Sequence, residues 1–173
     1  VMFWIAVVFA VLSVLVLAFV KEKKAAPKEK ENLFTAWKTL RPGFKRYLVA
    51  AGIFSLAYFS FSFLLLRAYQ LGFSVKDVVL LYALFNISFV IVSAPIGKLG
   101  DRIGRSKIVV LGYLVYLLMS LGFVFAVGKP SVIALFILFG IFYAIDEAQS
   151  KAFISDIEKK RRATAIGAYN FVT

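Results

Sequence analysis

Four stretches of this 173-residue chain run for 20 or 21 residues without a charged side chain. About 20 apolar residues in a helix are needed to cross the roughly 30 Å hydrocarbon core of a bilayer. Hydrophobic residues make up 62% of the chain, above the roughly 45–50% of soluble domains. This excess argues against a soluble globule and for membrane-spanning helices. The four stretches are 1–20, 47–66, 78–97 and 108–128.

Two further apolar segments follow. One covers 131–157 and continues in helical register through Asp146, Glu147 and Lys151, whereas the other covers the 11 residues 163–173, too few to span a bilayer. The chain begins at Val1 with no basic leader of the kind that a signal peptide needs. We therefore expect an all-α fold, a polytopic transmembrane helical bundle. We expect it to be incomplete, because the chain is cut from a longer protein.

The composition excludes most familiar catalytic chemistry. The chain has no cysteine, which excludes disulfides and thiolate metal or redox sites. It also has no histidine, which excludes an imidazole base, a Ser–His pair and a His-ligated metal. We expect a protein that is not an enzyme and that binds neither a metal nor a cofactor.

The basic residues predict the orientation in the membrane. Seventeen of the 21 lysines and arginines fall in three connections, 21–46, 98–107 and 158–162. By the positive-inside rule these connections face the cytoplasm, and we expect a multi-pass protein of a prokaryotic cell (inner) membrane. The net charge of +12 thus reflects topology, and we expect the lipid bilayer rather than nucleic acid as the partner.

The connection 21–46 is longer than the others. Its first part, 21–31, is rich in Lys, Glu and Ala and is expected to form a flexible tether. Residues 32–41 place apolar side chains at helical spacing and favour a short amphipathic helix at the interface. An irregular loop anchored by Trp37 is the alternative. The expected organisation is one spanning helix over 1–20, this cytoplasmic loop and a partial bundle over 47–173.

A motif in the expected inner loop resembles that of major facilitator superfamily transporters, G-x-L-x-D-R-x-G-R followed by basic residues. Ser106 departs from the pattern where a basic residue is usual, although Lys107 follows it. The six matching positions are Gly97, Leu99, Asp101, Arg102, Gly104 and Arg105.

The resemblance implies a transporter of twelve helices, in which a long cytoplasmic loop joins the sixth and seventh. The chain then resembles helix six, the central loop, helices seven to ten and the start of helix eleven. Its implied partner is the remaining N-terminal half. The implied function is secondary active transport of a small solute by alternating access between two bundles. A non-transporting membrane scaffold or receptor-like module that retains the fold is the alternative.

The motif residues suit a latch at the cytoplasmic side. Gly97 would let two helices approach closely, and Gly104 would permit a tight turn. We expect Asp101 to cap the start of the last helix, near 163–165, and Arg105 to pair with Asp156. By resemblance, this network holds the outward-facing state. The alternative is that the basic residues enforce topology alone.

Ionisable residues inside a spanning helix are costly and therefore mark candidate substrate or proton sites. Glu147 and Lys151 are four residues apart, which suits an intrahelical ion pair. One interpretation is that these residues pair with one another in a polar network near the cytoplasmic boundary. The other is that one of the carboxylates lines a cavity, where it binds a cationic group or carries a proton. The candidates in this segment are Asp146, Glu147, Lys151, Tyr143 and Gln149.

Asn86 is the remaining candidate. It lies near the middle of the stretch 78–97, where an asparagine either links helices by hydrogen bonds or contacts a substrate.

Overall fold

The computed structural model describes residues 2–19, 40–159 and 161–173. The chain divides into two units, Val1–Glu31 and Asn32–Thr173. In the first unit, helix α1 (Met2–Ala18) is free of charged residues. The expected tether 21–31 lies outside the described residues, as does all of the expected amphipathic segment except Leu40 and Arg41.

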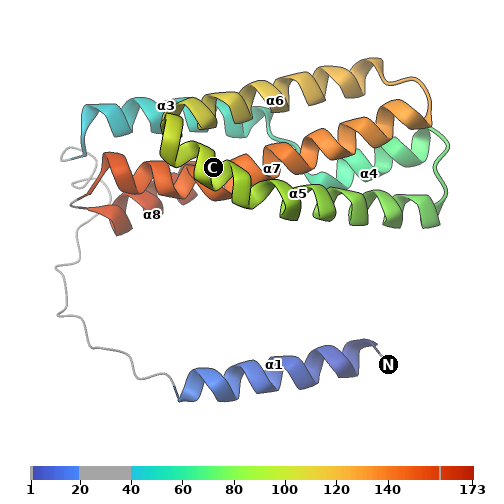
Figure 1. Cartoon of the computed structure of the whole chain (residues 1–173), viewed down its shortest axis with the longest axis horizontal. Helices are drawn as coiled ribbons and strands as arrows, with labels where there is room; N and C mark the ends of the chain where they lie inside the picture. Colours follow the sequence, from blue (N-terminus) through green and yellow to red (C-terminus); the bar gives the residue numbers. More distant parts are fainter. Residues whose placement is uncertain (1, 20–39, 160) are drawn as a thin grey trace. The chain divides into compact units, whose positions relative to one another are not determined.

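The described part of the second unit is helical without strands, which confirms the all-α class. Four of its segments are long and apolar enough to cross a membrane: Pro42–Gln70, Val75–Ile103, Arg105–Phe125 and Lys129–Ile157. The first of them consists of two helices (Figure 1). In chain order the helices are α3 (Pro42–Ala57), α4 (Phe61–Gln70), α5 (Val75–Ile103), α6 (Arg105–Phe125), α7 (Lys129–Ile157) and α8 (Arg162–Val172).

Pro42 is the first residue of α3, which therefore starts five residues before the apolar stretch 47–66. Proline suits this place because the first helical N–H has no intrahelical partner and the ring presets a helical φ.

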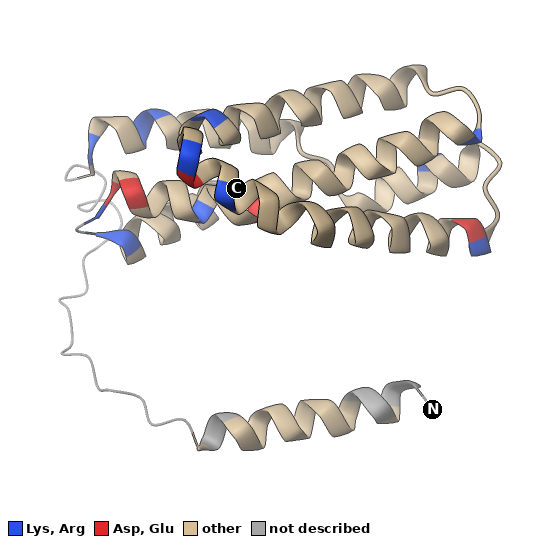
Figure 2. Ribbon diagram, in the orientation of Figure 1, with Lys and Arg blue, Asp and Glu red and all other residues tan. Residues whose placement is uncertain are grey.

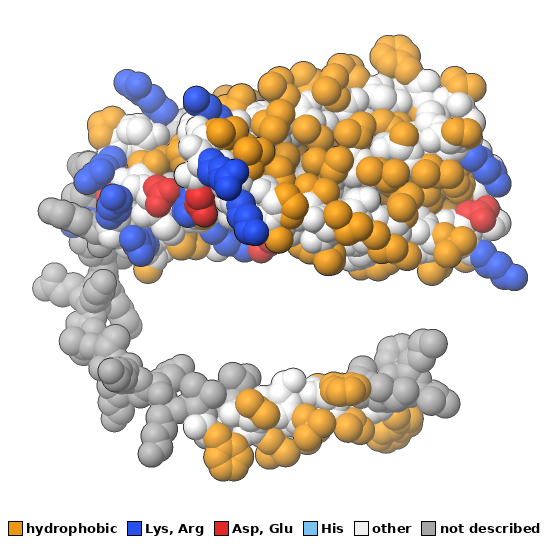
Figure 3. Space-filling view, viewed as in Figure 1, with side chains coloured by type: hydrophobic (Ala, Val, Ile, Leu, Met, Phe, Trp, Pro, Cys, Tyr) orange, Lys and Arg blue, Asp and Glu red, His pale blue; other side chains and the backbone are white. Residues whose placement is uncertain are grey.

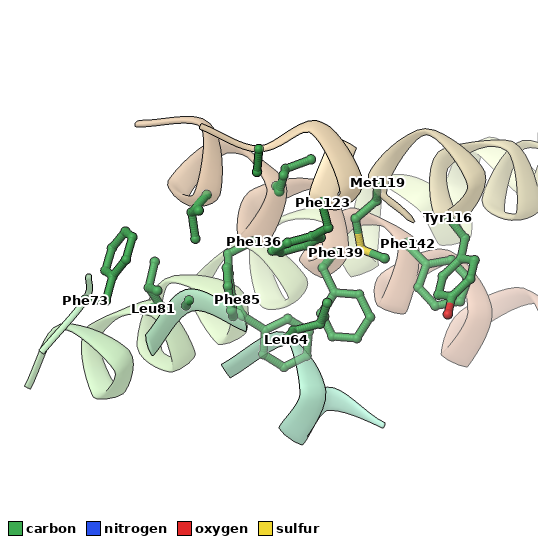
Figure 4. Close-up of a cluster of buried hydrophobic side chains, with 14 residues drawn as sticks. Leu64, Phe73, Leu81, Phe85, Tyr116, Met119, Phe123, Phe136, Phe139 and Phe142 are labelled. Carbon is green, nitrogen blue, oxygen red and sulfur yellow. The ribbon is translucent and has the colours of Figure 1, made fainter. Parts of the chain in front are cut away.

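Helix α7 forms the centre of the bundle, packed along both α5 and α6. Its Phe136, Phe139 and Phe142 are buried, and they form the middle of an aromatic core with Phe85 of α5 and Tyr116 of α6 (Figure 4). The outer surface in the view of Figure 3 is mostly apolar between two charged ends. A face of that kind suits contact with lipid tails.

A glycine allows the closest approach of α7 to α5. A methyl group added at Gly140 would lie 2.6 Å from Cβ of Ser88 and 2.8 Å from the Phe85 carbonyl oxygen. No side chain fits there without moving the α5 backbone. Small residues at such contacts let the backbones of membrane helices approach closely, so that van der Waals packing can hold the helices together where the bilayer gives no hydrophobic driving force.

The span expected over 47–66 is not one helix. It breaks at residues 58–60, between α3 and α4. The Tyr116 hydroxyl lies 3.1 Å from both backbone groups at the break, donating to the Ala57 carbonyl oxygen and accepting from the Phe59 N–H. The Ser60 side chain then accepts from the Ser62 N–H and caps α4. Broken helices persist in membranes where other groups satisfy the freed backbone atoms.

The inner loop expected over 98–107 is also shorter than predicted. Helix α5 continues through the motif to Ile103 and α6 begins at Arg105, so Gly104 alone separates them. Gly104 has φ +99°, a conformation that glycine adopts without a steric penalty. The expectation of a tight turn at Gly104 is confirmed.

We predict that Tyr116→Phe destabilises the protein. The substitution keeps the ring in the aromatic core but removes the hydroxyl from Ala57 and Phe59. An unsatisfied buried polar group costs about 1–3 kcal/mol, so the free energy of unfolding should fall by about this amount. Urea unfolding of the purified protein in detergent measures the change.

Tyr82→Phe is the matched control, because Tyr82 is half exposed and the described residues show no hydrogen bond from its hydroxyl. Equal stabilities of the two variants would contradict the assigned role of Tyr116.

Candidate functional site

Basic side chains gather at one end of the second unit (Figure 2). The start of α3, the turn between α5 and α6 and the end of α7 all meet there. The opposite end has few charges, and its Lys129 and Asp77 pair at 3.5 Å. This asymmetry matches the positive-inside pattern read from the sequence.

Arg105 connects three helices at the basic end. Its Nη2 lies 2.9 Å from Oδ1 of Asp101 on α5, and its Nη1 lies 3.3 Å from Oδ2 of Asp156 on α7. The expected contact between Arg105 and Asp156 is therefore present. Arg105 is the first residue of α6, so its guanidinium ties together the ends of α5, α6 and α7 that lie at the basic end of the bundle.

Asp101 does not take the place expected for it at the start of the last helix, near 163–165. Its carboxylate accepts hydrogen bonds from Nε and Nη2 of Arg105 instead. Asp101 and Arg105 are four positions apart in the sequence. The one-residue turn at Gly104 keeps their side chains on the same side of the α5–α6 connection, where they meet. Leu99 and Arg102 are both exposed.

The close helix contact expected at Gly97 lies one turn later, at Gly100. No atom lies within 4 Å of a methyl group placed at Gly97, whereas one placed at Gly100 would overlap the side-chain amide of Gln149. Gln149 is only 2% exposed, and its Nε2 donates to the Ile96 carbonyl oxygen at 3.0 Å. Gln149 thus links α7 to α5, and a contact of Gln149 with substrate stays a prediction.

Glu158 was not singled out from the sequence, yet it is only 4% exposed. Its Oε2 accepts a hydrogen bond from the Arg41 backbone N–H at 3.0 Å. A carboxylate just after α7 therefore holds the start of α3. No pattern in the sequence distinguishes Glu158 from the other acids of the basic connections.

A cavity of about 250 Å³ lies between α3, α6, α7 and α8. Two carboxylates line it, together with five aromatic side chains and no basic residue among those described. The lining residues are Ala51, Phe54, Ser55, Tyr58, Tyr113, Tyr143, Asp146, Glu147, Tyr169 and Thr173.

The two neighbouring acids of the cavity have different surroundings. Glu147 pairs with Lys151 at 3.0 Å, which confirms the expected intrahelical ion pair. Asp146 accepts a hydrogen bond from the Ser150 hydroxyl at 2.8 Å, and no described lysine or arginine pairs with it. A structural role as an ion pair therefore fits Glu147 and Lys151, whereas Asp146 lines the cavity without a direct ion-pair partner among the described residues.

Tyr143, one of the candidates named from the sequence, lines the cavity beside these acids. Asn86 does not, because its side-chain amide donates to the Tyr82 carbonyl oxygen of its own helix at 2.8 Å. Two tyrosines from other helices, Tyr113 and Tyr169, were missed. Tyr58, Tyr113 and Tyr169 lie far apart in the sequence, and only the packing of α3, α6 and α8 brings them to Asp146.

Comparison with known proteins finds one family and one relative that match this chain. The profile described as Major Facilitator Superfamily matches residues 1–173. An uncharacterized MFS-type transporter of Methanocaldococcus jannaschii is 37% identical over 172 residues, which cover 95% of this chain and 43% of that relative. The chain thus spans less than half the length of the curated relative. No solved structure matches it.

We predict that Gly100→Ala destabilises the contact between α5 and α7, because the added methyl group occupies the space of the Gln149 amide. Overpacking of this kind costs about 1–3 kcal/mol. Thermal unfolding of the purified protein in detergent should show the loss. The double variant Gly100→Ala with Gln149→Ala should recover part of it, because the shorter side chain vacates the space.

Gly97→Ala is the matched control, since a methyl group there meets open space. A destabilisation by Gly97→Ala as large as that by Gly100→Ala would contradict this assignment.

Proposed function

The chain belongs to the major facilitator superfamily, and on this premise we propose that it is part of a secondary active transporter that moves a small solute by alternating access. We further propose that residues 1–20 correspond to helix six, residues 21–46 to the central cytoplasmic loop and residues 47–173 to most of the C-terminal bundle. The N-terminal half of the same transporter is the proposed partner. Together the two halves would enclose the solute path.

The observation that carries this proposal is the carboxylate of Asp146 in a cavity of an otherwise apolar bundle. A charged group inside a membrane helix costs about 3 kcal/mol on insertion scales. A carboxylate without a described cationic partner therefore favours a function over a structural role. The cavity beside it supplies room for a solute.

The Arg105 network is the proposed conformational latch. The three side chains are between 29% and 64% exposed, and exposed ion pairs contribute only about 0.2–1 kcal/mol each. Contacts of this strength bias a conformational equilibrium without locking it. A bias is what alternating access requires, because the transporter must leave each state in every cycle.

Asp146 is also the proposed proton carrier if transport is coupled to protons. The polar groups around it come from every helix that lines the cavity. They are the hydroxyls of Ser150 and Tyr143 and the Glu147–Lys151 pair on α7, with Tyr58, Tyr113 and Tyr169 from the neighbouring segments. Hydroxyls can relay a proton toward a carboxylate without adding a competing charge.

We predict that Asp156→Asn opens the cytoplasmic side. The substitution removes the contact between Arg105 and α7 at constant size, and a loss of about 0.2–1 kcal/mol shifts the equilibrium by about 1.4- to 5-fold. The chain has no cysteine, so a Ser55→Cys reporter in the cavity can be labelled by an impermeant maleimide in inside-out vesicles. The labelling rate should rise by that factor.

Asp101→Asn should act in the same direction, because it removes the second contact of Arg105. Asp77→Asn is the control, since it breaks an ion pair at the opposite end of α5 and α7. Unchanged labelling in both Asp101→Asn and Asp156→Asn would contradict the latch.

We predict that Asp146→Asn abolishes proton coupling of solute flux. The full-length protein in proteoliposomes is first tested against a broad panel of solutes, with and without a pH gradient. Asn cannot take up and release a proton, so flux by Asp146→Asn should no longer respond to the gradient. Glu147→Gln should retain most of the response, because Glu147 is already paired with Lys151.

A wild-type response to the gradient in both variants would exclude these acids as proton carriers. A complete absence of flux across the panel would favour the scaffold alternative.

A further inference from the structure

We infer that the cavity beside Asp146 selects small organic cations, with an ammonium group held against the carboxylate by aromatic walls. This inference rests on the proposed transport function and names the substrate class of the same cavity. Nothing in the family assignment supplies it. It follows from the charge, the aromatic content and the size of the cavity.

Both charged side chains that line the cavity, Asp146 and Glu147, are acidic. Lys151 compensates Glu147 at 3.0 Å, whereas Asp146 has only the neutral Ser150 hydroxyl as its described partner. No described lysine or arginine lines the cavity. An anionic solute would face the carboxylate without a counter-charge, and a neutral one would leave it uncompensated. A cation restores the balance.

The walls suit an organic cation because five aromatic side chains surround the carboxylate. Ammonium groups are attracted to the faces of such rings, and tyrosine is among the better partners. Neighbouring rings hold these walls in place. Phe54 stacks on Tyr113 with centroids 4.0 Å apart, Tyr58 on Tyr116 at 5.5 Å, and Tyr169 on Tyr47 at 6.0 Å.

A bound metal ion fits this cavity less well. Calcium takes six to eight oxygen ligands and magnesium demands a regular octahedron. The described residues contain no group of three or more acidic side chains that could hold a metal ion, and Glu147 is occupied by Lys151. Aromatic rings in place of further oxygens favour an organic ammonium group over a hard metal ion.

The part of the cavity that this chain supplies has room for a small cation. About 250 Å³ is available within this chain, slightly below the roughly 300–1,000 Å³ of most small-molecule pockets. Such a space suits a quaternary or substituted ammonium with few carbon atoms. Choline is a suitable probe, and 3,3-dimethylbutan-1-ol has nearly the same shape without the charge.

The test measures the binding of both probes to the purified full-length protein in detergent, by isothermal titration calorimetry. We expect choline to bind at least about tenfold more tightly than the neutral isostere, which corresponds to about 1.4 kcal/mol. Asp146→Asn should remove this preference. The Ser150 hydroxyl can still donate to the new amide oxygen, and an unchanged unfolding temperature would show that the variant folds.

Two variants of Tyr143 separate the ring from its hydroxyl. Tyr143→Leu removes the ring face and should weaken choline affinity about fivefold or more, whereas Tyr143→Phe keeps the ring and should weaken it less. Asp77→Asn removes a carboxylate far from the cavity lining and should have no effect.

Equal affinities for choline and its isostere would overturn the inference, as would a lack of choline binding or full affinity in Asp146→Asn. The outcome is separable from that of the transport proposal. Flux of other solutes without choline binding would overturn the substrate class alone. Charge-selective binding without flux of any solute would overturn transport and leave the cation site intact.

Discussion

Every backbone amide in the apolar middle of this bundle must find its hydrogen-bond partner within the protein, because the hydrocarbon around it offers none. Continuous helices meet this requirement by themselves. The break between α3 and α4 meets it through a side chain, since the hydroxyl of Tyr116 serves both Ala57 and Phe59. The helix break places Tyr58 at the cavity. A break whose backbone groups are hydrogen-bonded by Tyr116 therefore contributes part of the candidate site.

Helix α7 connects the cavity with the Arg105 network. It carries Asp146 in the cavity wall and Asp156 at the Arg105 contact, ten residues or about 15 Å apart along the axis. Between them, Gln149 fixes α7 against α5 through the Ile96 carbonyl oxygen. A displacement of the C-terminal end of α7 would therefore reach the cavity through one continuous helix. This continuity gives a physical route for coupling a latch to a solute site.

The spans were predictable because their signal is local: charge-free stretches of bilayer length recur in the sequence, and helices form over them. The Arg105–Asp156 contact could also be predicted from the sequence, because both residues lie at ends of neighbouring spans. The helix break was not, because it depends on a tertiary partner. The tight turn at Gly104 was expected, but not that it would be a single residue long. The full lining of the cavity was the hardest feature to predict, because Tyr58, Tyr113 and Tyr169 converge only through helix packing.

The contrast between Asp146 and Glu147 explains why adjacent acids can have different uses. Successive residues of a helix point about 100° apart, so Glu147 faces the side of α7 that holds Lys151, while Asp146 faces Ser150 and the tyrosines. Glu147 is neutralised within one turn by its own helix, which makes its presence near the membrane boundary tolerable. Asp146 accepts a hydrogen bond from the neutral Ser150 hydroxyl and forms no ion pair with a described lysine or arginine. A cation or a proton that enters the cavity would balance its charge, and this is the basis of the proposed solute site.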